Sequence, residues 1–303
     1  MHYAGELAAL GTALCWTFGS QLFEAAGLRA GSMAVNLLRL VLALVFFCIV
    51  SLFVRGSLIP LDFPVHAWVW LGLSGFIGFA LGDLFLFQAF VEIGPRLSML
   101  VMTLTAPISA ILGLIFLGEV YTPLQWLAMA VTLSGVAWVI LERSGQGNGR
   151  RRKVRVITFT GVLYAFLGTV GQAVGYILSK YGMWIGDHFI EPFAATQIRI
   201  ISGIIGFMVI VTIRGSWGKV AAAVANKAAL GFMTAGAFVG PFLGVSLSLL
   251  ALHYTTAGVA TTITALVPIF LIPSVIVIGR EHVSLRAFLG AVVAVGGVIL
   301  LLV

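Results

Sequence analysis

The stretch LTAPISAILGLIFLGE at 104–119 decides the architecture, because a second version of it lies 161 residues further along the chain. In that version Ala265-Leu266-Val267-Pro268 replaces Leu104-Thr105-Ala106-Pro107. Gly279 then follows its proline at the same distance as Gly118 follows Pro107. Similarity to itself at a fixed separation predicts that the chain contains two copies of one structural unit.

Three weaker matches extend the repeat in both directions. Near the end of each copy, Ser134-Gly135 matches Gly296-Gly297. Earlier, Leu38-Arg39-Leu40 matches Ile198-Arg199-Ile200, which places one arginine at equivalent positions. A separation of 156 residues superposes one polar set on another: Trp16, Ser20 and Glu24 on Gln172, Tyr176 and Lys180.

The composition indicates a membrane protein. Of 303 residues, 61% are hydrophobic and only 9% are charged, too few charges to cover the surface of a soluble domain. A bilayer core of about 30 Å requires about 20 apolar residues per helix. That length predicts ten transmembrane helices, near 6–26, 33–54, 67–90, 96–117, 122–141, 156–179, 194–213, 228–252, 256–278 and 284–303.

Five spans per copy have a topological consequence. Because five is an odd number, the second copy enters the membrane from the opposite side. The expected fold is therefore an all-α integral membrane protein of ten helices arranged as two inverted five-helix repeats. The first repeat covers 1–142, a linker covers 143–155 and the second repeat covers 156–303.

The basic residues predict the orientation. The formal net charge is +7, and six of the seventeen Lys and Arg residues fall between Arg143 and Arg155. Such a cluster is typical of a cytoplasmic loop near anionic lipid, so no nucleic-acid partner is expected. Lys and Arg also collect in the other odd-numbered loops, so we expect both termini to face away from the cytoplasm.

These features resemble the drug/metabolite transporter superfamily, specifically its EamA-type ten-helix permeases. The residues that carry the resemblance are Pro107, Pro268 and the Leu117-Gly118-Glu119 helix end. The second copy departs from the motif, since Arg280 stands between Gly279 and Glu281. The resemblance implies that the first four helices of each half line a central cavity. It also implies that the fifth and tenth helices stand outside, where they could support a homodimer.

Three charged side chains lie inside predicted helices, where charge is costly. Asp83 could bind a cationic substrate group or a proton, or it could be a structural partner of Arg39 or Arg199; both interpretations stay open. For Arg39 and Arg199 the favoured role is structural: the guanidinium group pairs with a helix end or extends to the membrane interface. Their alternative role is to bind a substrate carboxylate through the two-pronged guanidinium group.

Polar stripes on the first and sixth helices supply further candidates. Trp16 and Tyr176 could form aromatic walls of a cavity, with Ser20 and Gln172 as hydrogen-bonding groups. Thr103 could line a polar path. Glu24 and Lys180 lie near opposite membrane surfaces and are expected to be gate or interface residues, with interfacial anchoring as the alternative.

Prolines and glycines predict where helices bend and meet. Pro107 and Pro268 each remove one helix hydrogen bond, so we expect kinks that act as hinges. Small residues let helices approach closely in lipid. Close packing is therefore expected at the four-residue glycine spacings: Gly78 and Gly82, Gly171 and Gly175, and Gly236, Gly240 and Gly244.

The leading hypothesis is a secondary transporter of amino acids or similar small metabolites, working outward across the cytoplasmic (inner) membrane of a prokaryote. Proton coupling is left open. The sequence has no phosphate-binding loop and no metal-ligand spacing, so we expect neither a cofactor nor a metal. The alternative is a membrane-embedded enzyme or lipid-processing protein, which would need clustered His, Asp or Ser residues at one membrane depth.

Overall fold

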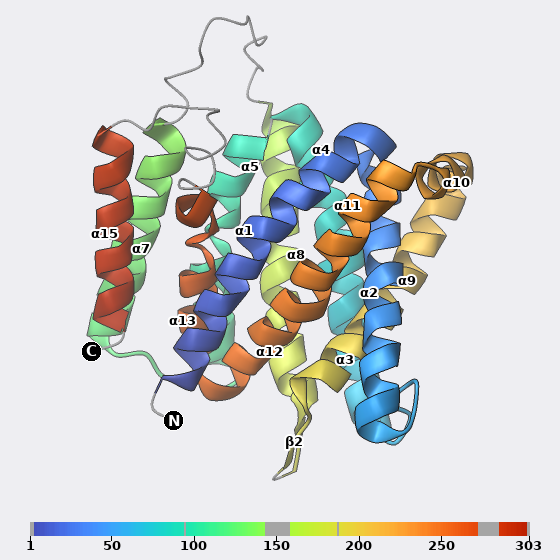
Figure 1. Ribbon diagram of the computed structural model, residues 1–303. Coiled ribbons are helices and arrows are strands. Elements are labelled where there is room, and N and C mark those ends of the chain that lie inside the picture. The colour runs from blue at the N-terminus through green and yellow to red at the C-terminus, as the bar shows by residue number, and fades with distance from the viewer. Residues whose placement is uncertain (1–2, 94, 143–157, 187, 272–284, 302–303) are drawn as a thin grey trace, which may run out of the picture.

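The computed structural model describes residues 3–93, 95–142, 158–186, 188–271 and 285–301. Within these ranges the chain forms a bundle of helices with one short hairpin (Figure 1). The predicted linker at 143–155 and the second-copy motif Gly279-Arg280-Glu281 lie outside the described residues.

The first half begins with two long helices, α1 (Ala4–Ala30) and α2 (Ser32–Arg55), joined at Gly31, whose φ is +79°. A third segment runs through α3 (Val65–Gly75), the π-helical η1 (Phe76–Gly82) and α4 (Asp83–Glu92). The fourth is divided into α5 (Pro95–Met102) and α6 (Thr105–Phe116), and the last helix is α7 (Pro123–Glu142).

The second half begins with α8 (Phe159–Met183). The hairpin of β1 (Trp184–Ile185) and β2 (His188–Phe189) leads from it to α9 (Pro192–Ile213). The short α10 (Trp217–Ala225) precedes a segment formed by α11 (Lys227–Ala237), η2 (Phe238–Gly244) and α12 (Val245–Tyr254). The final described helices are α13 (Ala257–Thr264), in an apolar segment that reaches Leu271, and α15 (Leu285–Leu301).

Side-chain caps explain where two of these helices start. The Thr158 hydroxyl accepts from the Gly161 N–H at 3.1 Å and begins α8. The Asn226 side-chain oxygen accepts from the Ala229 N–H at 3.0 Å and begins α11. Both caps use otherwise unpaired N–H groups of a helix's first turn.

Among the described residues, seven helical segments are long and apolar enough to cross a membrane, judged by length and composition alone. They coincide with seven of the ten predicted spans, from Ser32–Arg55 to Lys227–Tyr254. The other three predicted spans coincide with α1, which has 27 residues, and with shorter apolar helices at Ala257–Leu271 and Phe288–Leu301. The chain is an all-α, multi-pass membrane protein.

Equivalent helices of the two halves run in opposite directions. In Figure 1, α1 rises from the N-terminal end of the bundle, whereas α8 descends towards the β hairpin. Likewise α2 descends and α9 rises. This is the arrangement that two five-helix copies of opposite orientation would have.

The first helix of each half packs against the third segment of the other half, through glycine contacts at matching positions. A Cβ added to Gly19 would lie 3.5 Å from Cα of Gly240, and one added to Gly175 would lie 3.2 Å from Cα of Gly78. Two further contacts of α1 correspond to contacts of α8 at the same sequence separations. Cys15–Gly244 corresponds to Gly171–Gly82, and Gly5–Thr255 corresponds to Gly161–Ile93. The predicted close packing of the glycines is present, and the 156-residue superposition of the first helices is consistent with these contacts.

Both third segments contain a seven-residue π-helix at the same place. Phe-Ile-Gly-Phe-Ala-Leu-Gly forms η1 at 76–82, and Phe-Val-Gly-Pro-Phe-Leu-Gly forms η2 at 238–244. π-helical turns are rare and are frequent at functional sites. The glycine spacing predicted close packing here, but not the change of helix type.

Each of the two predicted hinge prolines follows a break in its helix by a few residues. α5 ends at Met102 and α6 begins at Thr105, so that Pro107 lies in the first turn of α6. In the second half the turn falls at 265–266, again just before Pro268. In a helix's first turn the missing N–H of proline costs nothing. In a continuous helix the N–H of each of these residues would bond the carbonyl four residues earlier, at Thr103 and at Thr264, which is where the breaks lie. The expected kinks are therefore present, and the hinge role stays a prediction.

The last helices of the two halves pair with each other. α7 and α15 lie side by side at one edge of the bundle (Figure 1, left). A Cβ on Gly135 would lie 2.4 Å from the Ala294 nitrogen, and one on Gly297 would lie 2.5 Å from the Thr132 nitrogen, so glycine is required at both contacts. Their place at the edge agrees with the expectation for the fifth and tenth helices. A homodimer stays a prediction.

Candidate functional site

A buried ion pair joins the second and third segments of the first half. A guanidinium nitrogen of Arg39, on α2, donates to a carboxylate oxygen of Asp83, the first residue of α4. Each residue is only 6% exposed. Because a lone charge is costly inside a membrane, each side chain provides the counter-charge that the other requires.

Gln172 links this ion pair to the second half. Its Nε2 donates to the other carboxylate oxygen of Asp83 at 3.0 Å and to the Gly78 carbonyl, within η1, at 3.1 Å. The close approach of Gly82 and Gly171 brings α8 near enough for these bonds. The structure therefore brings together three predicted site residues, Arg39, Asp83 and Gln172.

Arg199 occupies the equivalent position to Arg39 but has no such partner. The residue is 2% exposed, and its Cζ lies 4.7 Å from the ring centroid of Phe79 in η1, a cation–π contact. Its Nε and Nη1 have no hydrogen-bond acceptor in the described part of the chain. Asp83 and Tyr176 lie close enough to interact with it electrostatically.

The buried region around η1 is therefore positively charged. It contains two guanidinium groups and one carboxylate, and that carboxylate already accepts from Arg39 and Gln172. Buried N–H groups without acceptors cost free energy unless a ligand or water satisfies them. A planar anion such as a carboxylate would match the free edge of the Arg199 guanidinium group.

The remaining predicted binding residues form no hydrogen bond to this network within the described ranges. Trp16 packs on η2, 3.7 Å from the place where a Cβ of Gly240 would lie. The hydroxyls of Ser20 and Thr103 donate within their own segments, to the Thr17 carbonyl at 3.0 Å and the Leu100 carbonyl at 2.7 Å. Tyr176 is half-buried and lies close enough to Arg199 to interact with it electrostatically.

A second polar cluster involves the predicted gate residue Lys180. Its Nζ forms an ion pair with Glu119 at 2.6 Å and donates to the Thr255 carbonyl at 2.7 Å. Both oxygens of Glu119 also accept from the Ala257 N–H at 3.0 Å, at the start of α13. A carboxylate there is favoured by the positive end of the helix dipole.

Tyr121 completes this cluster. Its hydroxyl donates to Glu119 and accepts from the Gly258 N–H at 3.0 Å. Burial, and then the hydrogen bond to Glu119, raise the pKa of Tyr121 well above its usual value. The phenol therefore stays protonated and keeps donating across the physiological pH range.

Glu119 and Tyr121 were not predicted from the sequence to belong to a site. The available signal was the Leu117-Gly118-Glu119 helix end, which indicated the repeat and the family resemblance but no role for its glutamate. The other predicted gate residue, Glu24, is exposed near the end of α1, and no salt bridge to it occurs among the described residues. Lys180 and Glu24 lie near the C-terminal ends of two helices that run in opposite directions.

Neither polar cluster is arranged to hold a metal. In the part of the chain that the structure describes, no group of three or more His, Cys, Asp or Glu side chains comes together. Both clusters act through charge. The positively charged region around η1 can bind an anion, and the cluster of Glu119, Lys180 and Tyr121 joins α6, α8 and α13.

Comparisons with known proteins agree with this architecture. The sequence profile of the EamA-like transporter family matches residues 3–141 and again residues 159–303. Among solved structures, 28 chains match. One of them, a protein crystal structure, is 16% identical with a TM-score of 0.72, over 99% of this chain and 96% of that one, which shows the fold alone. None of the curated proteins matches the chain.

Proposed function

Because this chain belongs to the EamA-like transporter family, we propose that it is a secondary transporter that exports amino acids or similar small carboxylates by alternating access. The observation that carries the proposal is the buried guanidinium group of Arg199, which has two nitrogens without an acceptor. A substrate carboxylate would supply the missing acceptors and neutralise the excess charge. The family is one of transporters, and no observation favours an enzyme.

The proposed site includes the predicted side chains around η1. Arg199 binds the substrate carboxylate, and Tyr176 contributes a hydroxyl beside it. Arg39, Asp83 and Gln172 form the wall that holds η1 against α8. Trp16, Ser20 and Thr103 face the remainder of the passage.

The proposed cycle exchanges the roles of two halves of opposite orientation, 1–142 and 156–303, which together provide ten spans. The opposite directions of α1 and α8 and the matched glycine contacts support this arrangement. Two halves with similar packing energies can interconvert, so that a site between them opens to one side and then to the other.

The ion pair between Lys180 and Glu119 has the role of a gate in this cycle: it defines the closed end of the passage. Glu119 lies just after α6, Lys180 is on α8, and Ala257 begins α13, so the bonds of Glu119 join segments of both halves. We propose that these bonds close the passage at the membrane surface where α8 ends and break when that side opens. With the basic linker in the cytoplasm of a prokaryotic cell, that surface is the outer one.

The test is uptake of labelled amino acids and other metabolites into proteoliposomes that contain the purified protein, with and without a pH gradient. Saturable uptake above that of empty vesicles is expected, and its response to the gradient measures proton coupling. Arg199→Gln should raise KM for carboxylate substrates about 10- to 150-fold, since a hydrogen bond to a charged group contributes about 1.5–3 kcal/mol.

Two controls make the result specific to Arg199. Arg214→Gln removes an exposed arginine just beyond the end of α9 and should leave uptake unchanged. Amines that lack the carboxylate should be transported equally by Arg199→Gln and the parent protein. Unchanged uptake of amino acids by Arg199→Gln would refute the proposed site.

A further inference from the structure

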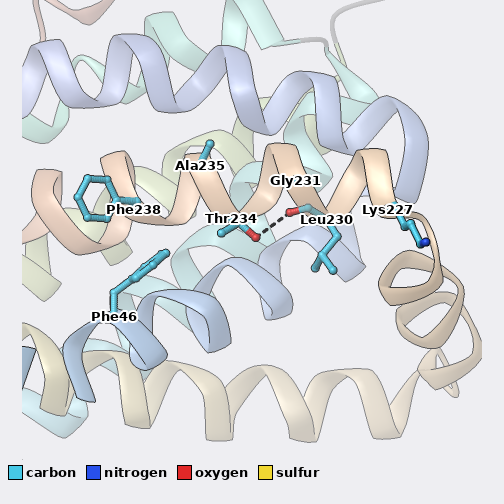
Figure 2. Close-up of a pocket in the computed structure, with 7 residues that line it drawn as sticks. All are labelled: Phe46, Lys227, Leu230, Gly231, Thr234, Ala235 and Phe238. Carbon is cyan, nitrogen blue, oxygen red and sulfur yellow. Dashed lines mark hydrogen bonds between the residues drawn. The ribbon is translucent and has the colours of Figure 1, made fainter. Parts of the chain in front are cut away.

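A groove opens to the outside of the bundle between α2 and the α11–η2 segment (Figure 2). Its volume is about 620 Å³, within the range of small-molecule sites. One lining residue comes from α2 and the others from the neighbouring segment: Phe46, then Lys227, Leu230, Gly231, Thr234, Ala235 and Phe238. None of these residues belongs to the proposed substrate site.

The length of the groove matches one leaflet of a bilayer. Lys227 and Phe238 are eleven residues apart, which is about 16 Å along a helix at about 1.5 Å per residue. Half of a hydrocarbon core of about 30 Å is about 15 Å. With Lys227 at the membrane surface, a groove of this length would reach about the midplane.

The interior of the groove suits a hydrocarbon chain. A Cβ added to Gly231 would meet no atom within 4 Å, so the missing side chain leaves a hollow on the surface of α11. The Thr234 hydroxyl donates to the Leu230 carbonyl at 2.8 Å, which satisfies it within its own helix (Figure 2). At the far end Phe46 and Phe238 meet edge to face, with ring centroids 5.3 Å apart.

The surface end of the groove is positively charged. Lys227 is exposed at the first position of α11, where the helix dipole also favours an anion. Arg29 reaches the same helix from α1, with its Cζ 4.8 Å from the ring centroid of Phe232. Lys219 is exposed on the adjacent α10. Cations at one end of an apolar groove complement a molecule with a phosphate at one end and a hydrocarbon chain behind it.

We propose that this groove binds one anionic phospholipid from the leaflet on the Lys227 side. An acyl chain lies along Leu230, Gly231 and Ala235 and ends at the Phe46–Phe238 pair, and Lys227 pairs with the phosphate. The proposal does not depend on the transported substrate. It rests on the groove, on its charge and on the membrane environment of the protein.

The test is native mass spectrometry of the full-length protein released from mixed micelles of phosphatidylglycerol and phosphatidylcholine. The parent protein should retain one phosphatidylglycerol in preference to phosphatidylcholine. Gly231→Leu fills the groove and should abolish the retained lipid. Gly218→Leu is the matched control, because a Cβ there also meets no atom within 4 Å but lies on α10, outside the groove.

A second variant tests recognition of the phosphate. Lys227→Gln should reduce the preference for phosphatidylglycerol about fivefold, the factor expected for one lysine beside anionic lipid. Arg214→Gln, which removes an exposed arginine just beyond the end of α9, should leave it unchanged. Lipid retention by Gly231→Leu at the level of the parent would overturn the groove assignment. Equal retention of both lipids by the parent would overturn the recognition of an anionic headgroup.

Discussion

Arg39 and Arg199 occupy equivalent places in the two halves, and their replacement is expected to have opposite effects on stability. Arg39→Gln leaves the Asp83 carboxylate buried with only the Gln172 amide as a partner. Arg199→Gln removes a cation that contacts the Phe79 ring and whose Nε and Nη1 have no acceptor among the described residues, and it leaves no carboxylate without its cation.

The magnitudes follow from the burial of the ion pair. Removing one member of a buried pair costs about 3–5 kcal/mol, because the other charge stays behind without compensation. At about 2 °C per kcal/mol for a protein of this size, Arg39→Gln should lower the apparent Tm by about 6–10 °C. Arg199→Gln should leave Tm unchanged or raise it, since the cost of burying an unpaired charge disappears.

The assay is thermal unfolding of the detergent-solubilised protein, followed with a thiol-reactive fluorophore. Cys15 and Cys48 are both free and half-buried, so unfolding exposes them to the dye. The double variant Arg39→Gln with Asp83→Asn should recover most of the lost stability, because it removes both charges. Equal decreases in Tm for Arg39→Gln and Arg199→Gln would refute the distinction between a paired and an unpaired arginine.

Three further predictions concern the closed end and the helix contacts. Glu119→Gln deprives Lys180 of its ion-pair partner and should increase the labelling of Thr256→Cys by impermeant thiol reagents, compared with Thr256→Cys alone; equal labelling would contradict a closing role for Glu119. Tyr121 has a raised pKa, so its stabilising effect is complete below its ordinary pKa of 10.0 and is lost as the pH rises above that value; the decrease of Tm above about pH 10 should be smaller in Tyr121→Phe, and an identical pH profile would count against it. A Cβ on Gly75 would lie 2.0 Å from a carbonyl oxygen of α9, so Gly75→Ala should abolish the monodisperse peak in size-exclusion chromatography while Gly218→Ala preserves it.

The helical segments were largely predictable from the sequence because a bilayer imposes one length on every span. The repeat was also predictable, since the two prolines and the two arginines keep nearly constant separations. The 156-residue offset, which rested on six polar residues, agrees with glycine contacts that the sequence alone could not pair. Those contacts lie between segments far apart in the chain.

The details of the site were less predictable. Asp83 had two candidate partners, and only the packing of α2 against the third segment selects Arg39 over Arg199. Glu119 looked like a helix-end residue because its partners, Lys180 and the start of α13, lie 61 and 138 residues away. The prolines predicted kinks in these helices, but the exact breaks at 103–104 and 265–266, just before Pro107 and Pro268, were not predicted from the sequence.

The π-helical segments determine in which direction around the helix axis the side chains of the following residues point. A π turn takes up about one more residue than an α turn, so the residues after η1 are rotated by about 100° relative to a continuous α-helix. Deletion of a single residue between Phe76 and Gly82 would reverse that rotation and turn Asp83 away from both Arg39 and Gln172. The site therefore requires both the Asp83 carboxylate and the correct number of residues in η1. A scan of substitutions, which keeps the length of the chain constant, would not detect the second requirement.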